Sequence, residues 1–427
     1  MSQTGHHRHV NKEAFCQAIR EVTPPEDTTS VDELVEWFGD SIEQAAQQSS
    51  QDSQHGADYQ WDPQQHRWQR ILDSGDQRLI WESIGWDGTL KSDNDNEEPS
   101  EEDFKSHFEA LLFDSEEPEL EDSCDQSPYI PCLDDPITPQ EVERAIKETK
   151  LKGYIGTSPG LLKWLPVRIV CLIAHILTLI FFSAAYPTKW CYTRLQTIFK
   201  GGCRQMCGNF RGIAIMDSLA KLYDCILNQR LVLWSVIDKA QAGAQKGRSC
   251  IEQILCLRLL IDFCMFRRQK LYIVFVDFKK AYDRVGRKKL IECLKKRGCG
   301  RMMLLALQVA YRCTKMLLQN TKIATNVGVR QGAPTSSLLF VMYIDEFVKK
   351  LKNCIPDDGF LGKLHTLLLM DDTVILATSR EMCEEKLKIL LEYCTESNMQ
   401  LNERKTKFMT INGKEADKQP IEVAGVR

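Results

Sequence analysis

The chain has 427 residues, 43% of them hydrophobic, so it has room for about two or three domains and can bury a sizeable core. Its 17 cysteines are an odd number, and no apolar signal segment follows Met1, which argues against a secreted disulfide framework and for reduced thiols. Residues 1–135 hold 8 Lys and Arg against 33 Asp and Glu, a net of −25, while the remainder holds 47 against 26, a net of +21. A basic body of this size is typical of proteins that bind a polyanion.

The N-terminal third has the composition of a poorly ordered segment. Residues 1–60 are rich in Gln, Ser, Asp and Glu, with short stretches of weak helical character such as 31–38. The segment 68–86 contains enough apolar residues to pack, and 104–112 has the periodicity of a short amphipathic helix after an acidic linker. We therefore predict that residues 1–135 are acidic and mostly disordered, with short connector helices.

Two helices can be predicted where the acidic region ends. Thr138 suits an N-cap, Pro139 suits the first helical position and Glu141 completes a capping box. Further on, the apolar run 169–186 reaches the lower edge of membrane-span length. Because His175 interrupts this run, the sequence favours a buried core helix over a transmembrane helix, and we expect no membrane partner.

Two β-forming segments, 198–202 and 209–214, lie on either side of a Gly-containing turn and predict a hairpin. The hairpin carries Lys200 and Arg211. The planar fork of an arginine suits the oxygens of a phosphate group. The residues alone equally allow an exposed hairpin whose charges are merely solvated.

Three aspartates accompany apolar β-forming segments. Residues 272–276 lead into Asp277, and the run 367–376 holds Asp371 and Asp372 at its centre, the pattern of a hairpin with the acids at its tip. Partly desolvated neighbouring carboxylates repel each other unless a cation lies between them. The pair alone also fits the polar turn of a buried hairpin. A second strand ending in an acid instead favours a site for two Mg²⁺ ions, which take oxygen ligands and clamp the oxygens of a phosphoryl transfer.

Three segments of the sequence resemble the motifs of reverse transcriptases, specifically those of non-LTR retrotransposons. They read VDFKKAYD at 276–283, RQGAPTS at 330–336 and LMDD at 369–372. The resemblance covers about residues 136–412. The chain departs from the common family form in having Leu-Met before the paired acids, where the family has Tyr-Ala, and one lysine fewer at the end of the predicted hairpin's first strand.

The resemblance implies a catalytic role for several residues. Asp277, Asp371 and Asp372 would be catalytic metal ligands for two Mg²⁺ ions, with Mn²⁺ as an alternative, and the Phe278 carbonyl would add a backbone ligand. Tyr282 would lie under the sugar and discriminate against a 2′-hydroxyl. Without the resemblance, ordinary core packing explains Tyr282 equally well.

Other residues would surround the incoming nucleotide. The resemblance implies that Lys200, Arg211, Gln331 and Gly332 line the nucleotide pocket. It also brings Lys405 to the triphosphate, where the lysine is a candidate proton donor to pyrophosphate. A solvated surface position is the alternative for Lys405.

One further acid, Asp283, is expected to have a structural role and no catalytic one. Asp283 is expected to cap the turn into a helix at 288–297 and to pair with Arg284 or Arg287.

These observations predict an α+β right-hand polymerase with an antiparallel palm sheet backed by helices. Residues 136–268 would form the fingers and connecting helices, and residues 269–427 a palm that is truncated at its C-terminal end. No thumb-like helices follow in the sequence, so we expect the thumb to be absent or truncated.

The predicted function is that of an RNA-directed DNA polymerase, the reverse transcriptase of a non-LTR retrotransposon. Its partners would be an RNA template, a DNA primer and deoxynucleoside triphosphates. The expected location is intracellular, in the nucleus or in a cytoplasmic ribonucleoprotein. The alternatives are a truncated or co-opted relative that binds RNA without catalysis and, resting on 169–186 alone, a membrane-anchored protein.

Overall fold

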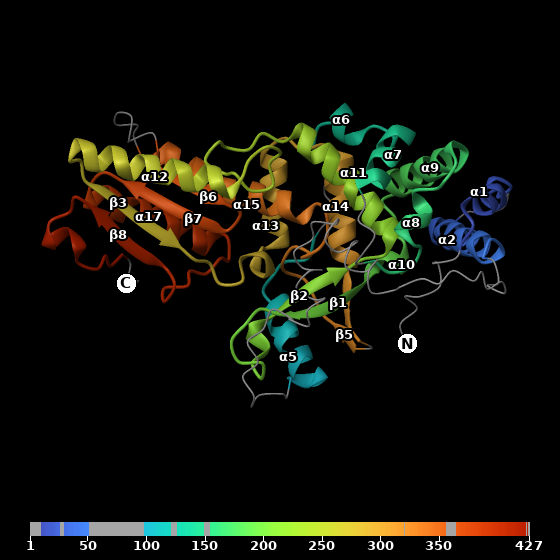
Figure 1. Cartoon of the computed structure of the whole chain (residues 1–427), viewed down its shortest axis with the longest axis horizontal. Helices are drawn as coiled ribbons and strands as arrows, with labels where there is room; N and C mark the ends of the chain where they lie inside the picture. Colours follow the sequence, from blue (N-terminus) through green and yellow to red (C-terminus); the bar gives the residue numbers. More distant parts are fainter. Residues whose placement is uncertain are drawn as a thin grey trace, which may run out of the picture.

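The computed structural model describes residues 10–25, 30–50, 98–120, 126–148, 154–319, 321–355, 364–423 and 425. The predicted packable segment 68–86 lies outside these residues. The described chain mixes helices with two four-stranded sheets, which lie side by side along the long axis of the molecule (Figure 1). The mixed α and β character predicted from the sequence is therefore confirmed.

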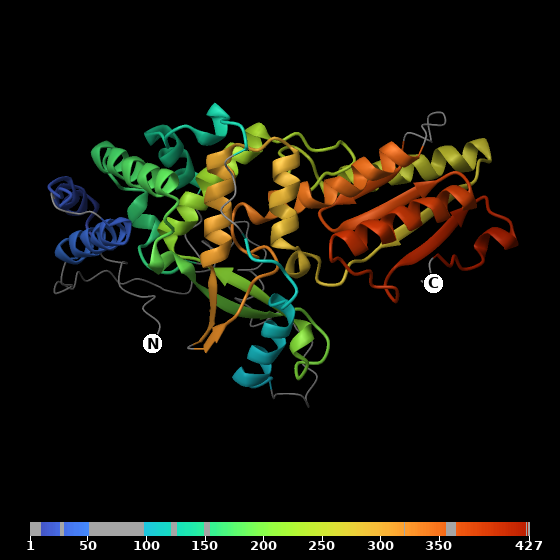
Figure 2. The same ribbon diagram turned by 180° about the vertical axis from the view of Figure 1, so that it is seen from behind.

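The second sheet is entirely antiparallel and has the strand order β6-β7-β3-β8. Helices α12 and α17 lie on its opposite faces, and α15 packs beside α17 (Figures 1 and 2). These elements are β3 (Leu271–Val276), β6 (Thr366–Leu369), β7 (Asp372–Ala377), β8 (Lys407–Ile411), α12 (Cys250–Arg267), α15 (Ser336–Cys354) and α17 (Arg380–Glu396). The sequence-predicted strand before Asp277 and the hairpin around Asp371 are both confirmed.

Alternation along β3 explains why the second sheet is covered on both faces. Leu271 and Ile273 belong to the small core beneath α12, whereas Tyr272, Val274 and Val276 belong to the main core. Successive side chains of a strand point to opposite faces, so a strand that is apolar at every position requires cover on both sides.

The first sheet has the order β2-β1-β4-β5, with β1 and β4 parallel and the other pairs antiparallel. Its strands are β1 (Tyr192–Phe199), β2 (Phe210–Ile215), β4 (Lys315–Leu318) and β5 (Thr321–Ile323). Helix α5 (Glu101–Leu112) packs Phe104 and Phe108 against Leu195 and Phe210 of this sheet. The predicted hairpin and the predicted helix at 104–112 are thus confirmed, and they pack on one another.

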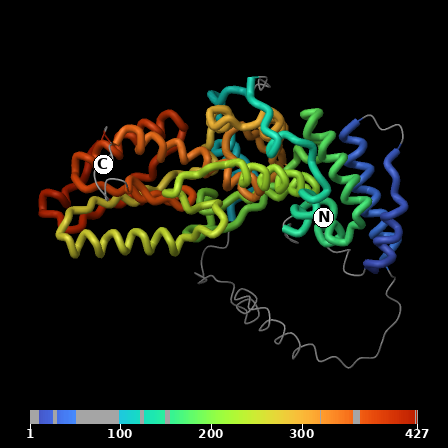
Figure 3. Tube along the Cα trace, turned by 90° about the horizontal axis from the view of Figure 1, so that it is seen from above, coloured from blue at the N-terminus to red at the C-terminus, as the bar shows by residue number. Residues whose placement is uncertain are grey.

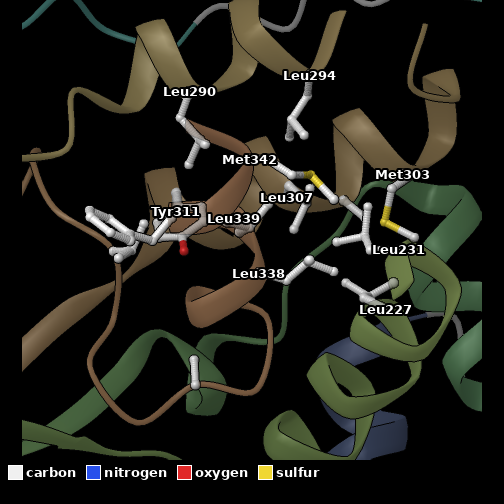
Figure 4. Packing of buried hydrophobic residues seen from close by; sticks show 14 of the residues in the cluster. Leu227, Leu231, Leu290, Leu294, Met303, Leu307, Tyr311, Leu338, Leu339 and Met342 are labelled. Atoms are coloured by element: carbon white, nitrogen blue, oxygen red, sulfur yellow. The ribbon is translucent and has the colours of Figure 1, made fainter. Parts of the chain in front are cut away.

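A core of long apolar side chains packs between helices of the main cluster (Figure 4). It is formed where α11 (Ser218–Trp234), α13 (Arg287–Lys296) and α14 (Arg301–Cys313) meet α15. Its members include Leu227, Leu231, Leu290, Leu294, Met303, Leu307, Leu338, Leu339 and Met342.

The N-terminal region differs from its prediction. Instead of mostly disorder, residues 12–20 and 31–48 form α1 (Lys12–Arg20) and α2 (Val31–Gln48), which pack against each other and against α9 (Val167–Ser183), at the end of the molecule away from the second sheet (Figure 3). Apolar residues at helical spacing, such as Phe15 with Ile19 and Val35 with Phe38, are fully or almost fully buried there. The polar composition of the segment hid this periodicity, since only a narrow stripe of each helix is apolar.

Helix α9 is the buried core helix that the run 169–186 predicted. Eight of its residues are buried in the main core, among them Ile173, Leu177 and Phe181. Among the helices in the described ranges, none combines the length and the apolar character needed to cross a bilayer.

Arg230 connects α11 to the segment that opens the folded region. Its guanidinium donates to both carboxylate oxygens of Glu141, at 2.6 and 2.9 Å, and to three backbone carbonyls between residues 133 and 136. Glu141 also accepts from Thr138, as its capping box predicted. The helices joined in this way are α6 (Pro131–Asp134), α7 (Pro139–Glu148) and α11; the short α8 (Pro159–Leu162) and α10 (Thr188–Cys191) complete this half.

We expect Arg230→Met to lower the free energy of unfolding by about 3–5 kcal/mol. The substitution leaves the partly buried Glu141 carboxylate and three backbone carbonyls without their hydrogen-bond donor. The control is Arg258→Met, which removes an exposed i,i+4 partner of Asp262 and should cost at most about 1 kcal/mol. Urea denaturation of both variants measures the difference. Equal destabilisation by the two would contradict the anchoring role of Arg230.

Candidate active site

A cavity of about 980 Å³ is lined by residues from both sheets and from the loops between them. It collects all but one of the site residues predicted from the sequence: Lys200, Arg211, Asp277, Phe278, Tyr282, Gln331, Gly332, Asp371 and Lys405. These residues are separated by up to about 200 positions in the chain, so their meeting in one cavity comes from the tertiary fold.

The carboxylates of Asp277 and Asp371 are brought together by strand pairing. In the antiparallel ladder of β3 and β7, Val276 lies opposite Thr373, so the residue that follows β3 emerges beside the tip of the β6–β7 hairpin. The third predicted acid, Asp372, is exposed and lies outside the cavity lining. Asp371 belongs to the turn between β6 and β7, whereas Asp372 is the first residue of β7, and only Asp371 of the pair lines the cavity.

Asn402 orients the first of these carboxylates. Its side-chain Nδ2 donates to Oδ2 of Asp277 at 2.8 Å, and its backbone N–H donates to the carbonyl of Asp277 at 2.7 Å. The backbone N–H of Asp277 in turn donates to the hydroxyl of Thr406 at 3.3 Å. The segment preceding β8 therefore holds Asp277 at both its backbone and its side chain.

Gln241 fixes the turn that carries Asp371. Met370 has a φ of +60°, in the left-handed region that is costly for a side chain with a Cβ. The fully buried Gln241 amide accepts from the Met370 N–H at 2.9 Å and donates to the Met370 carbonyl at 3.1 Å. Backbone hydrogen bonds between Leu368 and residues 240 and 242 hold the same segment along β6. The strained tip is thus compensated by a buried side chain from outside the hairpin.

The environment of Asp371 disfavours its negative charge. Burial raises the pKa of this carboxyl, the neighbouring Asp372 and Asp277 raise it further, and Arg211 acts in the opposite direction. Two carboxylates facing one cavity in this way form a donor set for a hard divalent cation. Mg²⁺ commonly takes only one or two protein carboxylates and completes its shell with water and substrate phosphates.

No group of three or more His, Cys, Asp or Glu side chains in the described ranges is arranged as a ready-made metal site. The residues present therefore fit an ion that shares its ligands with a substrate and do not form an all-protein cage.

The lining of the cavity also contains cationic residues. Lys200 and Arg211 extend from β1 and β2, while Lys280 and Lys405 line the same space. Burial lowers the pKa of the Lys200 ammonium, and the positive charges of Lys280 and Arg211 lower it further. Cations that repel one another across a cavity favour the binding of a polyanion between them.

Tyr282 lies flat against a core aromatic ring. Its ring stacks on that of Phe340 at a centroid distance of 4.4 Å and an interplanar angle of 14°. Burial raises the pKa of its hydroxyl to about 12, so the group remains protonated at neutral pH. The core packing considered from the sequence is therefore present, and Tyr282 also lines the cavity.

The loop of residues 330–335 is held by a fully buried ion pair. Arg330 donates to Asp224 of α11 at 3.2 Å, and the backbone N–H and hydroxyl of Thr335 donate to the same carboxylate at 2.9 and 3.0 Å. Gly332 follows with a φ of +121°, and a Cβ there would stand 2.5 Å from the Ala214 carbonyl of β2. The loop consequently needs glycine at this position to lie against the hairpin.

The expected partner of Asp283 was wrong. Its carboxylate accepts from the side-chain amide of Gln331 at 2.5 Å. Arg287 donates instead to backbone carbonyls, among them those of Gly328 and Tyr311. Arg287 is almost completely buried. Its guanidinium donates hydrogen bonds to buried backbone carbonyls that would otherwise lack a partner.

Residues 198–427, about half of the chain, match the family model described as "Reverse transcriptase (RNA-dependent DNA polymerase)". The chain belongs to the reverse transcriptase family. The matched region contains every cavity-lining residue named above, from Lys200 to Lys405.

Curated relatives of this reverse transcriptase include proteins of insect and amphibian transposons. It is 25% identical over 287 residues to the Pol polyprotein from the type-1 retrotransposable element R2 of Popillia japonica, covering 65% of this chain and 40% of that protein. It is 26% identical over 318 residues to a probable RNA-directed DNA polymerase from transposon BS of Drosophila melanogaster, covering 68% and 34%. A 149 kDa protein of transposon TX1 from Xenopus laevis is 24% identical over 273 residues, covering 59% and 21%. The matches thus span two fifths or less of these relatives.

Three residues of the site escaped the sequence reasoning. Gln241, Asn402 and Asp283 act on site residues that lie 129, 125 and 48 positions away in the chain. Each is a common polar residue in a loop or turn, so no local pattern distinguishes it. The signal in the sequence was that Asp283 ends the motif-like segment 276–283, and that Gln241 and Asn402 lie within the region of about residues 136–412 that resembles reverse transcriptases.

We expect Gln241→Leu to destabilise the protein by about 2–4 kcal/mol, because the N–H and the carbonyl of Met370 then lose a buried partner. The exposed Gln196 on β1 provides the control, and Gln196→Leu should change stability by less than about 0.5 kcal/mol. Thermal unfolding of the two variants makes the comparison. A Gln241→Leu protein as stable as the control would show that the tip does not depend on this amide.

Asp371→Asn should stabilise the metal-free protein. A carboxyl whose pKa is higher in the folded than in the unfolded state costs stability once the pH exceeds its unfolded pKa, and the full cost is present above the raised folded value. The amide removes this cost, so we expect the Tm at pH 7.5 in EDTA to rise by about 1–3 °C and the gain to vanish near pH 3. A lower Tm at pH 7.5 would mean that the charge is not disfavoured.

Proposed function

We propose that this chain provides the nucleotidyl-transfer site of an RNA-directed DNA polymerase from a non-LTR retrotransposon. The observation that carries the proposal is one cavity whose lining combines the acids Asp277 and Asp371 with the cations Lys200, Arg211 and Lys405. Transfer of a nucleotide needs both, since negative charge develops on the attacking and leaving oxygens and rests on the triphosphate.

We assign the parts of the fold accordingly. The first sheet with α5 would be the fingers, and the second sheet with α12, α15 and α17 would be the palm. The β1–β2 hairpin then reaches over the cavity as the element that holds the triphosphate. Template RNA and a DNA primer would be the further partners, a role in keeping with the net positive charge of residues 136–427.

In this mechanism, each residue acts through its position. Arg211 and Lys200 bind the triphosphate, with the arginine fork matched to phosphate oxygens. Tyr282 lies beneath the sugar and obstructs a 2′-hydroxyl, while Gln331 and Gly332 shape the wall beside it. Lys405 is placed to give a proton to the departing pyrophosphate.

Asp277, Asp371 and the Phe278 carbonyl would hold Mg²⁺, or Mn²⁺ in its place. When bound, two such ions would lower the barrier by neutralising charge on the attacking and leaving oxygens. Asp372 is proposed only as a supporting carboxylate, because this residue is not part of the cavity lining.

Primer extension on an RNA template tests this function. Asp277→Asn and Asp371→Asn should each reduce nucleotide incorporation by about 10³-fold or more, since each removes a ligand from the ions. Asp262→Asn, an isosteric change on the exposed side of α12, should leave incorporation within about twofold of the wild type.

Equal incorporation by the wild type and both site variants would reject the catalytic assignment. Absence of incorporation from every protein, with salt-sensitive RNA binding retained, would instead identify a relative that binds RNA without catalysis.

A further inference from the structure

Helix α12 is apolar on two sides. Leu260 and Cys264 are buried in the small core against the second sheet, together with Ile273 of β3 and Leu367 of β6. The other side of the helix carries six large apolar side chains that are between 54% and 84% exposed: Ile251, Ile254, Leu255, Leu259, Met265 and Phe266. A helix that is apolar all round is normally buried all round, so this second surface, the α12 face, has the character of an interface.

The α12 face is continuous and lies on the outside of the molecule. Figure 3 shows α12 along the outer margin of the half that contains the second sheet. Residues 251, 255, 258, 262 and 266 follow one another at spacings of three or four, so they form one stripe along the helix. A groove of about 780 Å³, whose lining includes Leu259, Phe263 and Leu364, borders this stripe and extends its apolar surface.

Two charges of opposite sign interrupt the stripe close to the middle of α12. Arg258 donates to Asp262 at 2.9 Å, and both side chains are exposed. An exposed pair within one helix contributes little to the stability of a single chain. The pair gains a different meaning when a second copy of the same surface is considered.

The α12 face is complementary to itself when one of two helices is reversed. With a two-fold axis at residue 260, residue 258 of each helix lies opposite residue 262 of the other. Arg258 then meets Asp262 of the second copy twice, and Ile254 and Leu255 lie opposite Phe266 and Met265. Parallel packing in register would instead place arginine against arginine and aspartate against aspartate, which is unfavourable. The charges therefore select the antiparallel arrangement.

We propose that the α12 face is the interface of a symmetric dimer of this chain, in which two α12 helices pack antiparallel about a two-fold axis near residue 260. The apolar side chains supply the affinity, and the four alternating charges at the centre fix direction and register.

The expected dimer is weak and leaves the candidate active site open. A helix of 18 residues is about 27 Å long, so its contact with a second copy falls at the small end of the range for specific complexes. We expect the dimer to dissociate in the micromolar range. Among the described residues, none that lines the active-site cavity belongs to α12, so the proposed dimer does not use the residues of that site.

Sedimentation velocity of the whole chain, over about 1–200 µM protein, tests the dimer. The wild type should shift from monomer to dimer across this range. Arg258→Asp and Asp262→Arg should each weaken the dimer by at least about tenfold, because each variant places two pairs of like charges opposite each other.

Mixing the two charge variants tests the antiparallel pairing itself. The acidic pair of Arg258→Asp then faces the basic pair of Asp262→Arg, so the mixture should form a heterodimer more tightly than either variant associates alone. The double variant Arg258→Asp/Asp262→Arg should restore the homodimer to within about threefold of the wild type. Nucleotide incorporation by all three variants should stay within about twofold of the wild type, which shows that the fold is intact.

A matched pair of apolar substitutions separates this surface from exposed apolar residues in general. Leu255→Ser lies on the α12 face and should weaken the dimer by at least about fivefold. Val167→Ser removes a comparably exposed apolar side chain at the start of α9 and should leave the dimer unchanged.

A wild type that stays monomeric over the whole concentration range would overturn the proposal and leave the α12 face to a partner of another kind. A dimer that Leu255→Ser and both charge variants leave unchanged would also overturn it, because the interface would then lie elsewhere. Failure of the mixed charge variants to form a heterodimer would contradict the antiparallel pairing. Loss of polymerase activity from the wild type, with the dimer retained, would overturn only the proposed function.

Discussion

Antiparallel pairing of β3 with β7 is the constraint on which the site depends. The pairing aligns Val276 with Thr373, so that an acid at the end of one strand and an acid at the tip of a hairpin face the same cavity. A slip of one residue would move every side chain of β7 to the other face. Ile375 and Ala377 face the main core while Leu376 faces the core beneath α12, so such a slip would exchange the side chains that pack these two cores.

The loops that complete the site are each held by a buried polar contact from a distant segment. Gln241 compensates the left-handed Met370, Asn402 orients Asp277, and Asp224 receives both Arg330 and Thr335. A buried polar contact of this kind has little effect on the free energy of folding when every group has a partner, and the loss of one partner destabilises the fold strongly. The protein thus places its charged groups on rigid supports, which suits a site that must collect phosphates without reorganising.

Much of this arrangement was predictable from local sequence patterns. Apolar alternation and an acidic tip predicted the β6–β7 hairpin, and Thr138 with Glu141 predicted the start of α7, since each of these signals acts within a few residues. The resemblance to reverse transcriptases named nine residues that all line one cavity. The resemblance grouped Asp372 with Asp371 as metal ligands, yet Asp372 begins β7 and is exposed outside the cavity lining, which Asp371 reaches from the turn.

The remaining features depend on contacts that no short window contains. The partner of Asp283 is set by how the loop before α15 docks on β2, and charge alone had suggested an arginine nearby in sequence. Helices α1 and α2 were missed for a different reason. Their composition resembles that of disordered segments. Their narrow apolar stripes are buried only through tertiary packing, chiefly against α9.

The central claim is that Asp277 and Asp371 together hold the divalent ions of the reaction. Electron paramagnetic resonance of Mn²⁺, titrated into the protein with a dideoxy-terminated primer on template and the matching nucleotide, counts those ions without any turnover. The account predicts about two bound Mn²⁺ per wild-type chain and the loss of at least one in both Asp277→Asn and Asp371→Asn. The same number of tightly bound ions in the wild type and in these variants would contradict it.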